Sequence, residues 1–260
     1  IGGDTEQVFG LKDTNPLFAT SYIYTKAGFK QMDFGADSPM LTQMSEDRWI
    51  YGQDIEGEDF SEADRAKIGR DVKRLFMGEY SQNWQKFLDG IKIARFKSTS
   101  GALDTLSILA DPVYSPLLSV AEVAANNTAL TPKPTLPGGM NANGVALPVS
   151  SNVRRAGSAL AGSAAGALND RYQPTPVDIR FEELQRITKS EQGRPARIQQ
   201  YLSAIQGVQE YLTEIDSAPN ANEAAFVSAK ARFAGGSGDA IKQLRIKAGN
   251  APAPMNQWLK

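Results

Sequence analysis

Two residue types are missing from this chain of 260 residues, which contains no histidine and no cysteine. Without histidine, no imidazole is available as an acid, a base or a metal ligand, and mechanisms that need one are excluded. Without cysteine, thiol nucleophiles, thiolate zinc sites and disulfide bonds are excluded as well. A cysteine-free chain is compatible with a reducing or an oxidising compartment, so this absence does not indicate where the protein works.

Long apolar runs and an excess of one charge are also missing. No run of eighteen apolar residues occurs, so we expect no membrane span. The 28 basic and 29 acidic residues leave a net charge of −1, which gives no general attraction to nucleic acid. The chain opens IGGDTEQVFG, without an initiator methionine or the basic and apolar regions of a signal peptide. We therefore expect a fragment of a longer protein.

The most informative stretch is Ser61 to Ile91, which the helical spacing of its apolar residues predicts to be one long helix. The residues of this predicted face are Ile68, Val72, Leu75, Phe76, Tyr80, Trp84, Phe87, Leu88 and Ile91. Ser61 is the expected N-cap, with Asp64 three residues on. At about 1.5 Å per residue, the helix would be roughly 45 Å long. We expect Tyr80 and Trp84 to be buried against helices at 100–110 and 116–126.

Capped helices separated by short loops are predicted on both sides of this stretch, so the expected fold class is all-α. Their expected starts are Thr25, Ser38-Pro39, Ser98 or Ser100, Ser115-Pro116, Thr175-Pro176, Arg194, Asn222 and Ser237. Only two short strand pieces are predicted, at Val8–Leu11 and Ser21–Tyr24. Apart from these pieces, we expect helices throughout.

The segment 131–173 differs from the rest, because it is rich in proline, glycine, asparagine and alanine and poor in large apolar residues. Such a composition predicts a flexible linker. We therefore expect a first helical subdomain at 1–130, organised on the helix at 61–91. A second subdomain of about four helices is expected at 174–260.

Carboxylates are the side chains best able to support catalysis here, because glycoside hydrolysis needs only Asp and Glu. Glu79 beside Tyr80 is one candidate, and Glu46 with Asp47 is another. The acidic loop 54–59 lacks the alternating ligands and central glycine of a calcium loop. In each case a solvated or ion-paired carboxylate is the better interpretation, so we predict no catalytic, cofactor-binding or metal-binding residue.

Other motifs also favour structural roles over binding. The run Gly235-Gly236-Ser237-Gly238 lacks the lysine of a phosphate-binding loop and fits a helix end followed by a helix start. The methionines fit a helical core better than an adaptable binding face; these are Met32, Met40, Met44 and Met77. The basic pairs Arg154-Arg155 and Arg194 with Arg197 lack interleaved aromatics, so nucleic-acid binding is not expected.

Within the long helix, LFMGEYSQNWQKFLDGIKI (75–93) resembles the "lYl.dY…W..fL..l.l" pattern of the TssM/IcmF family of type VI secretion. YIYTKAGF (22–29) and EDRWIYG (46–52) are similar to the family's "lyTr.Gy" and "..dWvlg" segments. SPLLSVAEVAANNTAL (115–130) is similar to "sPl..ll..v...t.L". After the predicted linker, PVDIRFEELQRI, RIQQYLSAIQGVQEYL and IKQLRIKAGNAPAPMNQWL resemble the family's helical region.

The resemblance implies a periplasmic part of a large inner-membrane protein. In that family TssM joins TssL and the outer-membrane lipoprotein TssJ in an envelope-spanning complex. The resemblance thus implies self-association within the complex, with TssJ and TssL bound through other parts of the full-length protein.

Three functions remain open at this point. The first is a structural, envelope-spanning strut without turnover. The second is a cell-wall glycan hydrolase that uses a carboxylate pair. The third is an unrelated helical interaction module that shares only the helical patterning.

Overall fold

The computed structural model describes residues 8–9, 20–46, 61–132, 173–190, 193–233 and 239–259. Within these ranges the regular elements are helices, and no strand is formed, which confirms the all-α prediction. Tyr22–Tyr24 forms a 3-10 helix (η1), so the strand predicted at Ser21–Tyr24 is wrong. Phe9 makes an isolated antiparallel bridge to Ile93. None of the described helices is long and apolar enough to cross a bilayer.

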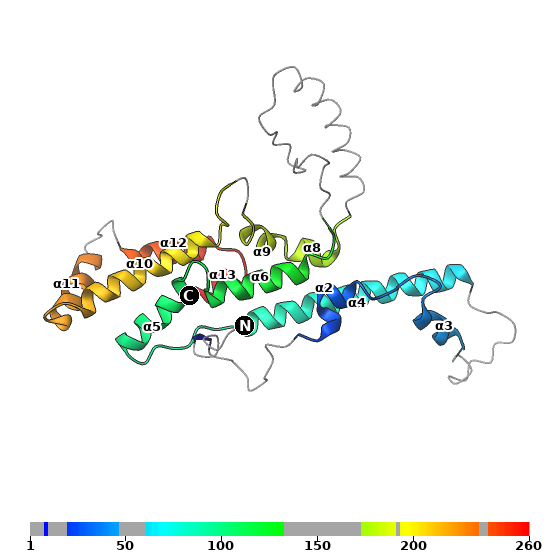
Figure 1. Ribbon diagram of the computed structural model, residues 1–260, viewed down its shortest axis with the longest axis horizontal. Coiled ribbons are helices and arrows are strands. Elements are labelled where there is room, and N and C mark those ends of the chain that lie inside the picture. Colours follow the sequence, from blue (N-terminus) through cyan, green and yellow to red (C-terminus); the bar gives the residue numbers. More distant parts are fainter. Residues whose placement is uncertain are drawn as a thin grey trace, which may run out of the picture. The chain divides into compact units, whose positions relative to one another are not determined.

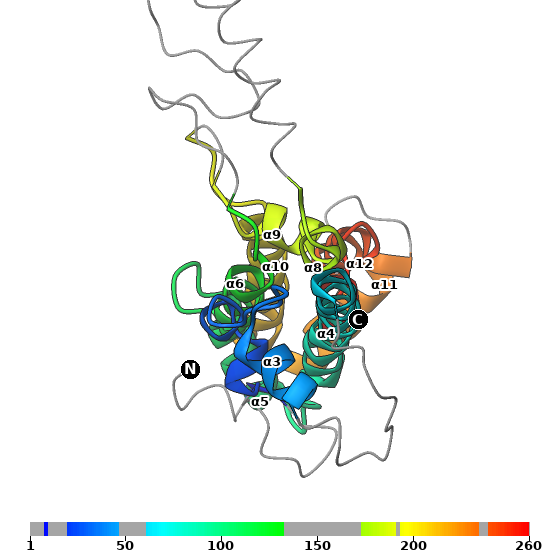
Figure 2. The same cartoon turned by 90° about the vertical axis from the view of Figure 1, so that its right-hand side faces the viewer.

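The long helix is confirmed as α4 (Glu62–Gly90), a single helix in Figure 1 that Figure 2 views nearly end-on. Ser61 caps it, because the Asp64 amide donates to the Ser61 hydroxyl oxygen at 3.2 Å. The Asp64 carboxylate in turn accepts from the Ser61 amide at 3.3 Å and hydroxyl at 2.7 Å. These reciprocal bonds satisfy backbone donors that an uncapped helix start leaves without partners.

The helices before the predicted linker start at the expected residues. They are α2 (Lys26–Phe29), α3 (Pro39–Glu46), α5 (Thr99–Ala110) and α6 (Pro116–Thr128). The hydroxyls of Thr25, Ser38 and Ser98 each accept a backbone amide of the helix that follows. Of the two alternatives for α5, Ser98 is therefore the cap.

The later helices depart from the prediction in several places. They are α8 (Pro176–Arg180), α9 (Glu182–Ile187), α10 (Gln199–Asp216), α11 (Ala221–Phe233), α12 (Ala240–Gly249) and α13 (Met255–Trp258). The helix predicted through 179–187 is two short helices. Asn220 rather than Asn222 caps α11, since its side-chain oxygen accepts the Glu223 amide at 3.3 Å. Asp239 caps α12, accepting from Ile241 and Lys242.

The chain divides into two compact units, each built from separated stretches of sequence. Unit 1 comprises 1–32, 79–128 and 181–260, and unit 2 comprises 33–78 and 129–180. In unit 1, α10 packs against α5, α11 and α12, and α6 packs against α2, α5 and α9. Helices from both sides of the predicted linker thus share one unit. This grouping differs from the predicted ranges 1–130 and 174–260. Of 131–173, only 131–132 and 173 are described.

In unit 2, α4 makes a close backbone approach at Gly69. A Cβ atom on Gly69 would lie 2.2 Å from the backbone oxygen of Phe34 and 3.3 Å from a side-chain carbon of Leu41. The ring of Phe34 also packs on Phe76, with ring centroids 5.8 Å apart. Glycine is therefore the residue that allows the 33–38 segment to pack directly on the helix.

The predicted apolar face of α4 holds only in its C-terminal half. Tyr80, Trp84 and Leu88 are 0–2% exposed, as predicted. Leu75 was expected on the same face but is 66% exposed, whereas Met77 is buried. Residues 75 and 77 differ by about 200° around a helix axis, so the buried face in this turn lies on the other side.

Candidate interaction site

The aromatic pair on α4 that carries the family pattern forms part of the core of unit 1. The Tyr80 hydroxyl donates to the backbone carbonyl of Asn127 at the end of α6, at 2.5 Å. The Trp84 indole N–H donates to the backbone carbonyl of Tyr24 at 2.8 Å. The rings of Tyr24 and Tyr80 meet edge-on, with centroids 6.0 Å apart. Burial of both predicted residues is confirmed, and η1 is a neighbour that the prediction did not include.

Glu79, the first catalytic candidate, takes part in the same cluster. Its carboxylate accepts a hydrogen bond from the Tyr24 hydroxyl at 3.3 Å. Burial raises the pKa of Tyr24 above its ordinary value, and the negative charge and hydrogen bond of Glu79 raise it further. Glu79 is an exposed side chain whose contact holds η1 to α4, which is the structural interpretation of this residue.

The other predicted sites are only partly within the described ranges. Asp47, the acidic loop 54–59, Arg154-Arg155 and Gly235–Gly238 lie outside them, as does the side chain of Glu46. Within the described residues no cluster of acidic side chains could hold a metal ion. The methionines do not form one core cluster, because Met77 is buried while Met40 is 42% exposed. Arg194 and Arg197 are exposed.

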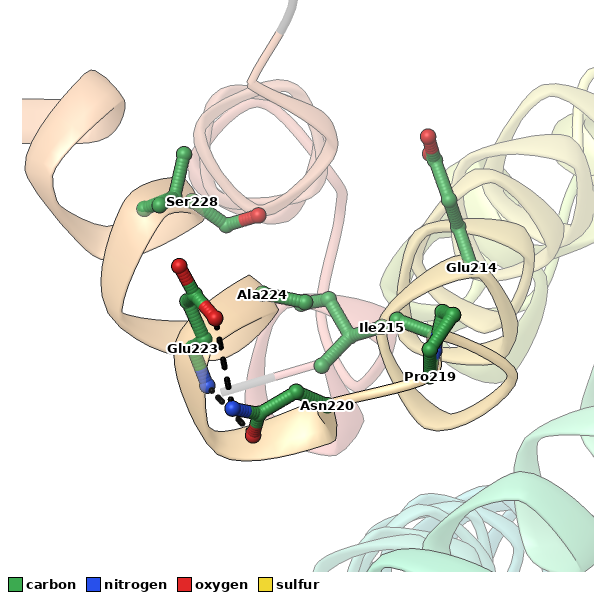
Figure 3. Close-up of a pocket in the computed structure, with 9 residues that line it drawn as sticks. Glu214, Ile215, Pro219, Asn220, Glu223, Ala224 and Ser228 are labelled. Atoms are coloured by element: carbon green, nitrogen blue, oxygen red, sulfur yellow. Dashed lines mark hydrogen bonds between the residues drawn. The ribbon is translucent and has the colours of Figure 1, made fainter.

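A surface pocket of about 500 Å³ lies where α10 turns into α11 (Figure 3). Its apolar lining comes from Ile215 of α10 and from Ala224 and Val227 of α11. Glu214 and Glu223 line opposite sides of it, one from each helix. Glu223 accepts a hydrogen bond from the Asn220 side chain at 3.2 Å, which holds its carboxylate at the rim. The pocket is thus apolar inside and acidic at its edge.

The helix α11 is mostly exposed, although Ala224, Ser228 and Ala229 are half-buried. Phe226, Val227 and Phe233 are the large apolar residues of this helix, and they are 70%, 58% and 94% exposed. No residue of α11 is buried. Arg232 ties its end to the start of α12, because its guanidinium binds the Asp239 carboxylate at 3.0 Å. Helical spacing alone cannot tell whether an apolar helix face lies in the core or is exposed to a partner.

A second exposed aromatic is presented by the turn between α5 and α6. Tyr114 is 82% and Val113 is 63% exposed. The Asp111 carboxylate accepts from the amides of both residues, at 2.6 and 2.8 Å, and these bonds hold the pKa of Asp111 below its usual value. The buried Ser115 hydroxyl donates to Leu109, and the Gln199 side chain donates to the Pro112 carbonyl at 3.0 Å. Tyr114 therefore projects from a fixed turn.

In unit 2, one buried carboxylate connects two segments that are distant in sequence. Asp178 is 4% exposed. Its Oδ1 accepts the amides of Leu130 and Thr131 at 2.8 and 3.2 Å. Its Oδ2 accepts the Thr131 hydroxyl at 2.7 Å and the amide and hydroxyl of Thr175 at 2.8 and 2.7 Å. The spacing of Thr175 and Asp178 signals a capping box, but nothing in the sequence indicates the bonds to 130–131.

Comparison with known proteins agrees with the pattern found around Tyr80 and Trp84. Residues 1–129 match the family described as "IcmF-related: Intracellular multiplication and human macrophage-killing". The type VI secretion system component TssM1 of Pseudomonas aeruginosa is 26% identical over 209 residues, which cover 77% of this chain. The chain spans only 18% of that relative's length. No solved structure matches the chain. Together the two sequence matches show that this chain belongs to the TssM/IcmF family.

Proposed function

We propose that this chain is a structural segment of a type VI secretion membrane complex, lying in the periplasm and acting as part of an envelope-spanning strut. The observation that carries this proposal is the 26% identity to TssM1 over most of the chain. In the proposal, TssL and the lipoprotein TssJ bind to other parts of the full-length protein. The segment described here contributes contacts between subunits.

The packing of unit 1 is suited to carrying load between distant parts of the chain. Trp258 is hydrogen-bonded to Leu88, 170 residues away, and Tyr80 to Asn127. Both bonds involve buried aromatic rings on the core side of helices. Such long-range contacts join distant parts of the chain into one packed unit, which fits a structural role.

We propose further that the segment has no enzymatic turnover. The two carboxylates of the α10–α11 pocket lie on opposite sides of it, and Glu223 is engaged by Asn220 (Figure 3). Glu79 is engaged by Tyr24. The test is incubation of the chain with purified cell-wall glycan. Release of new reducing ends that Glu214→Gln or Glu79→Gln abolishes would establish the hydrolase alternative instead.

The structural role is tested in the parent protein. Removal of the segment corresponding to residues 1–260 is expected to abolish both assembly of the membrane complex and secretion, at unchanged levels of the remaining protein. The matched control is a parent carrying Leu75→Ala, which changes only a 66% exposed side chain and is expected to secrete normally. Normal assembly and secretion without the segment would overturn the proposal.

A further inference from the structure

Basic residues precede α10 and acidic residues lie in its C-terminal half, an order of charges that a helix dipole disfavours at the two ends. Arg194 and Arg197 precede its first residue, while Glu210, Glu214 and Asp216 lie in its C-terminal half. A helix is partly positive at its start and partly negative at its end, so Arg197 before the first turn and Glu214 and Asp216 in the last turn lower helix stability. The ion pairs formed within the described residues include none of these five. Glu210 accepts a hydrogen bond from the Gln206 side chain at 2.9 Å, and the charges at the two ends that remain point to a role outside the chain.

Each end of α10 combines its charge with an exposed apolar feature. At the start, Gln199 holds the turn from which Tyr114 and Val113 project, with Arg197 two residues away in sequence. At the end, Glu214 lines the pocket whose apolar interior includes Ile215 and Val227. We call the first feature the Tyr114 turn (residues 111–115) and the second the α10–α11 pocket.

We propose that the Tyr114 turn of one copy docks into the α10–α11 pocket of a second copy of this chain. The Tyr114 ring enters the pocket, whose volume of about 500 Å³ admits an aromatic side chain. Arg194 and Arg197 meet the acidic rim formed by Glu214 and Glu223. The turn is already fixed by Asp111, Ser115 and Gln199, so little conformational entropy is lost when Tyr114 is immobilised.

Charge complementarity selects a second copy as the occupant, because every chain carries the acidic pocket and also Arg194 and Arg197, which shortly precede the Gln199 that holds the Tyr114 turn. They cannot meet within one chain, because they lie at opposite ends of an 18-residue helix, about 25 Å apart. The contact is therefore heterologous, with different surfaces on the two sides, and it builds rings or open chains rather than a symmetric dimer. The inference deepens the proposed structural role and rests on it by naming the surfaces that join subunits.

The test is the oligomeric state of the 260-residue chain by sedimentation equilibrium. We expect the wild-type mass to rise with concentration in a range of about 10 μM to 1 mM, where weak contacts become populated. The turn variant is Tyr114→Ser with Arg197→Glu, and the pocket variant is Glu214→Lys with Val227→Lys. Each is expected to weaken association at least tenfold, because anchors in a contact centre dominate its affinity.

Mixing the two variants gives the decisive result. The pocket variant retains an intact turn and the turn variant retains an intact pocket, so one functional contact remains between them. A mixture is expected to form 1:1 dimers that grow no further, while each variant alone stays monomeric. A wild-type chain that stays monomeric throughout the range overturns the inference. Wild-type assemblies that both variants leave unchanged, or a mixture that stays monomeric, do so too.

The controls separate loss of contact from loss of fold. Tyr22→Ser with Glu122→Lys removes another exposed tyrosine and another exposed acid, and is expected to associate like wild type. Glu214→Lys improves the match to the α10 dipole, so the pocket variant is expected to keep its helical signal. If either double variant loses that signal, Tyr114→Ser or Val227→Ser alone replaces it. If secretion fails without the segment while both variants associate normally, the structural role stands and this inference falls.

Discussion

The indole N–H of Trp258 donates a hydrogen bond to the backbone carbonyl of Leu88, at 3.1 Å, across 170 residues of sequence. Leu88 lies in the last turn of α4, where its carbonyl also accepts the Ile91 amide at 3.3 Å. Trp258 is 3% exposed, so its N–H also needs a partner inside the protein. The contact thus satisfies the buried indole N–H, gives the Leu88 carbonyl a second donor and fastens α13 to the end of α4.

Replacing Trp258 by phenylalanine is expected to destabilise unit 1 by about 2–3 kcal/mol. The substitution keeps an aromatic ring but removes the indole donor, so the Leu88 carbonyl keeps only the Ile91 amide as its partner and a small cavity forms. The measurement is urea-induced unfolding followed by circular dichroism. Gln257→Ala, an exposed neighbour on α13, is the control and should change stability by less than about 0.5 kcal/mol. Equal stability of the two variants would contradict this role for Trp258.

Trp84→Ala is expected to cost about 3–5 kcal/mol, because it removes a large ring that is 2% exposed and leaves a cavity. The Tyr24 carbonyl also loses the indole donor that binds it at 2.8 Å. Leu75→Ala lies on the same helix but changes a 66% exposed side chain, so its expected cost is below about 0.5 kcal/mol. Thermal unfolding of both variants checks the difference. A near-zero effect of Trp84→Ala would mean that the ring belongs to a partner surface.

The sequence predicted those parts of the fold that depend on local chemistry. Capping residues such as Ser61 and Ser98 were identified because their hydroxyls satisfy backbone amides within three residues. The buried pair Tyr80 and Trp84 followed from helical spacing. Phe226 and Phe233 have the same apolar character, yet they are 70% and 94% exposed. Whether an apolar stripe faces a core depends on long-range packing, which the local spacing of apolar residues does not predict.

The candidate interaction site was less accessible from the sequence for the same reason. The Tyr114 turn contains the recognisable pair Asp111-Pro112. Its bond to Gln199, however, joins residues 87 apart, and no local motif marks that bond or the exposure of the turn. The α10–α11 pocket arises from the angle at which two helices meet, and no motif marks it. The bonds of Asp178 to Leu130 and Thr131 are likewise non-local.

Gly69→Ala is expected to destabilise the protein, whereas Gly78→Ala on the same helix is not. A Cβ at position 69 would lie 2.2 Å from the Phe34 backbone oxygen, so the 33–38 segment must move away. At position 78 nothing lies within 4 Å, and alanine gains about 0.5–1 kcal/mol through its higher helix propensity. The two midpoints of thermal unfolding should therefore shift in opposite directions. A stabilising effect of Gly69→Ala would contradict the close approach seen here.

Asp178→Asn is expected to loosen the two segments that the carboxylate joins. Its two oxygens accept five hydrogen bonds, whereas an amide offers one oxygen and places an NH2 group against the donors of Thr131 or Thr175. The expected loss of stability is about 2–4 kcal/mol, because buried donors are left without partners. Limited proteolysis near 130 and 175 should become faster. Asp64→Asn changes an exposed capping carboxylate and serves as the control, with a loss of at most about 1 kcal/mol.

The Arg232–Asp239 ion pair should make the stability of the fold depend on pH in the acidic range. Burial raises the pKa of Asp239, but the Arg232 hydrogen bond and the amides of Lys242 and Ile241 outweigh this and lower the pKa below its ordinary value of 3.8. A carboxyl group with a lowered pKa in the folded state stabilises the fold above the unfolded pKa and loses that contribution as pH falls through the folded one. Asp239→Asn should therefore unfold at a lower temperature than wild type at neutral pH. The difference between the two unfolding temperatures should become smaller below pH 3.8. Taking the difference between the two proteins cancels the titration of other carboxylates, including Asp111. A difference that stays constant across this range would show that the charge of Asp239 contributes nothing, and that only its capping oxygen matters.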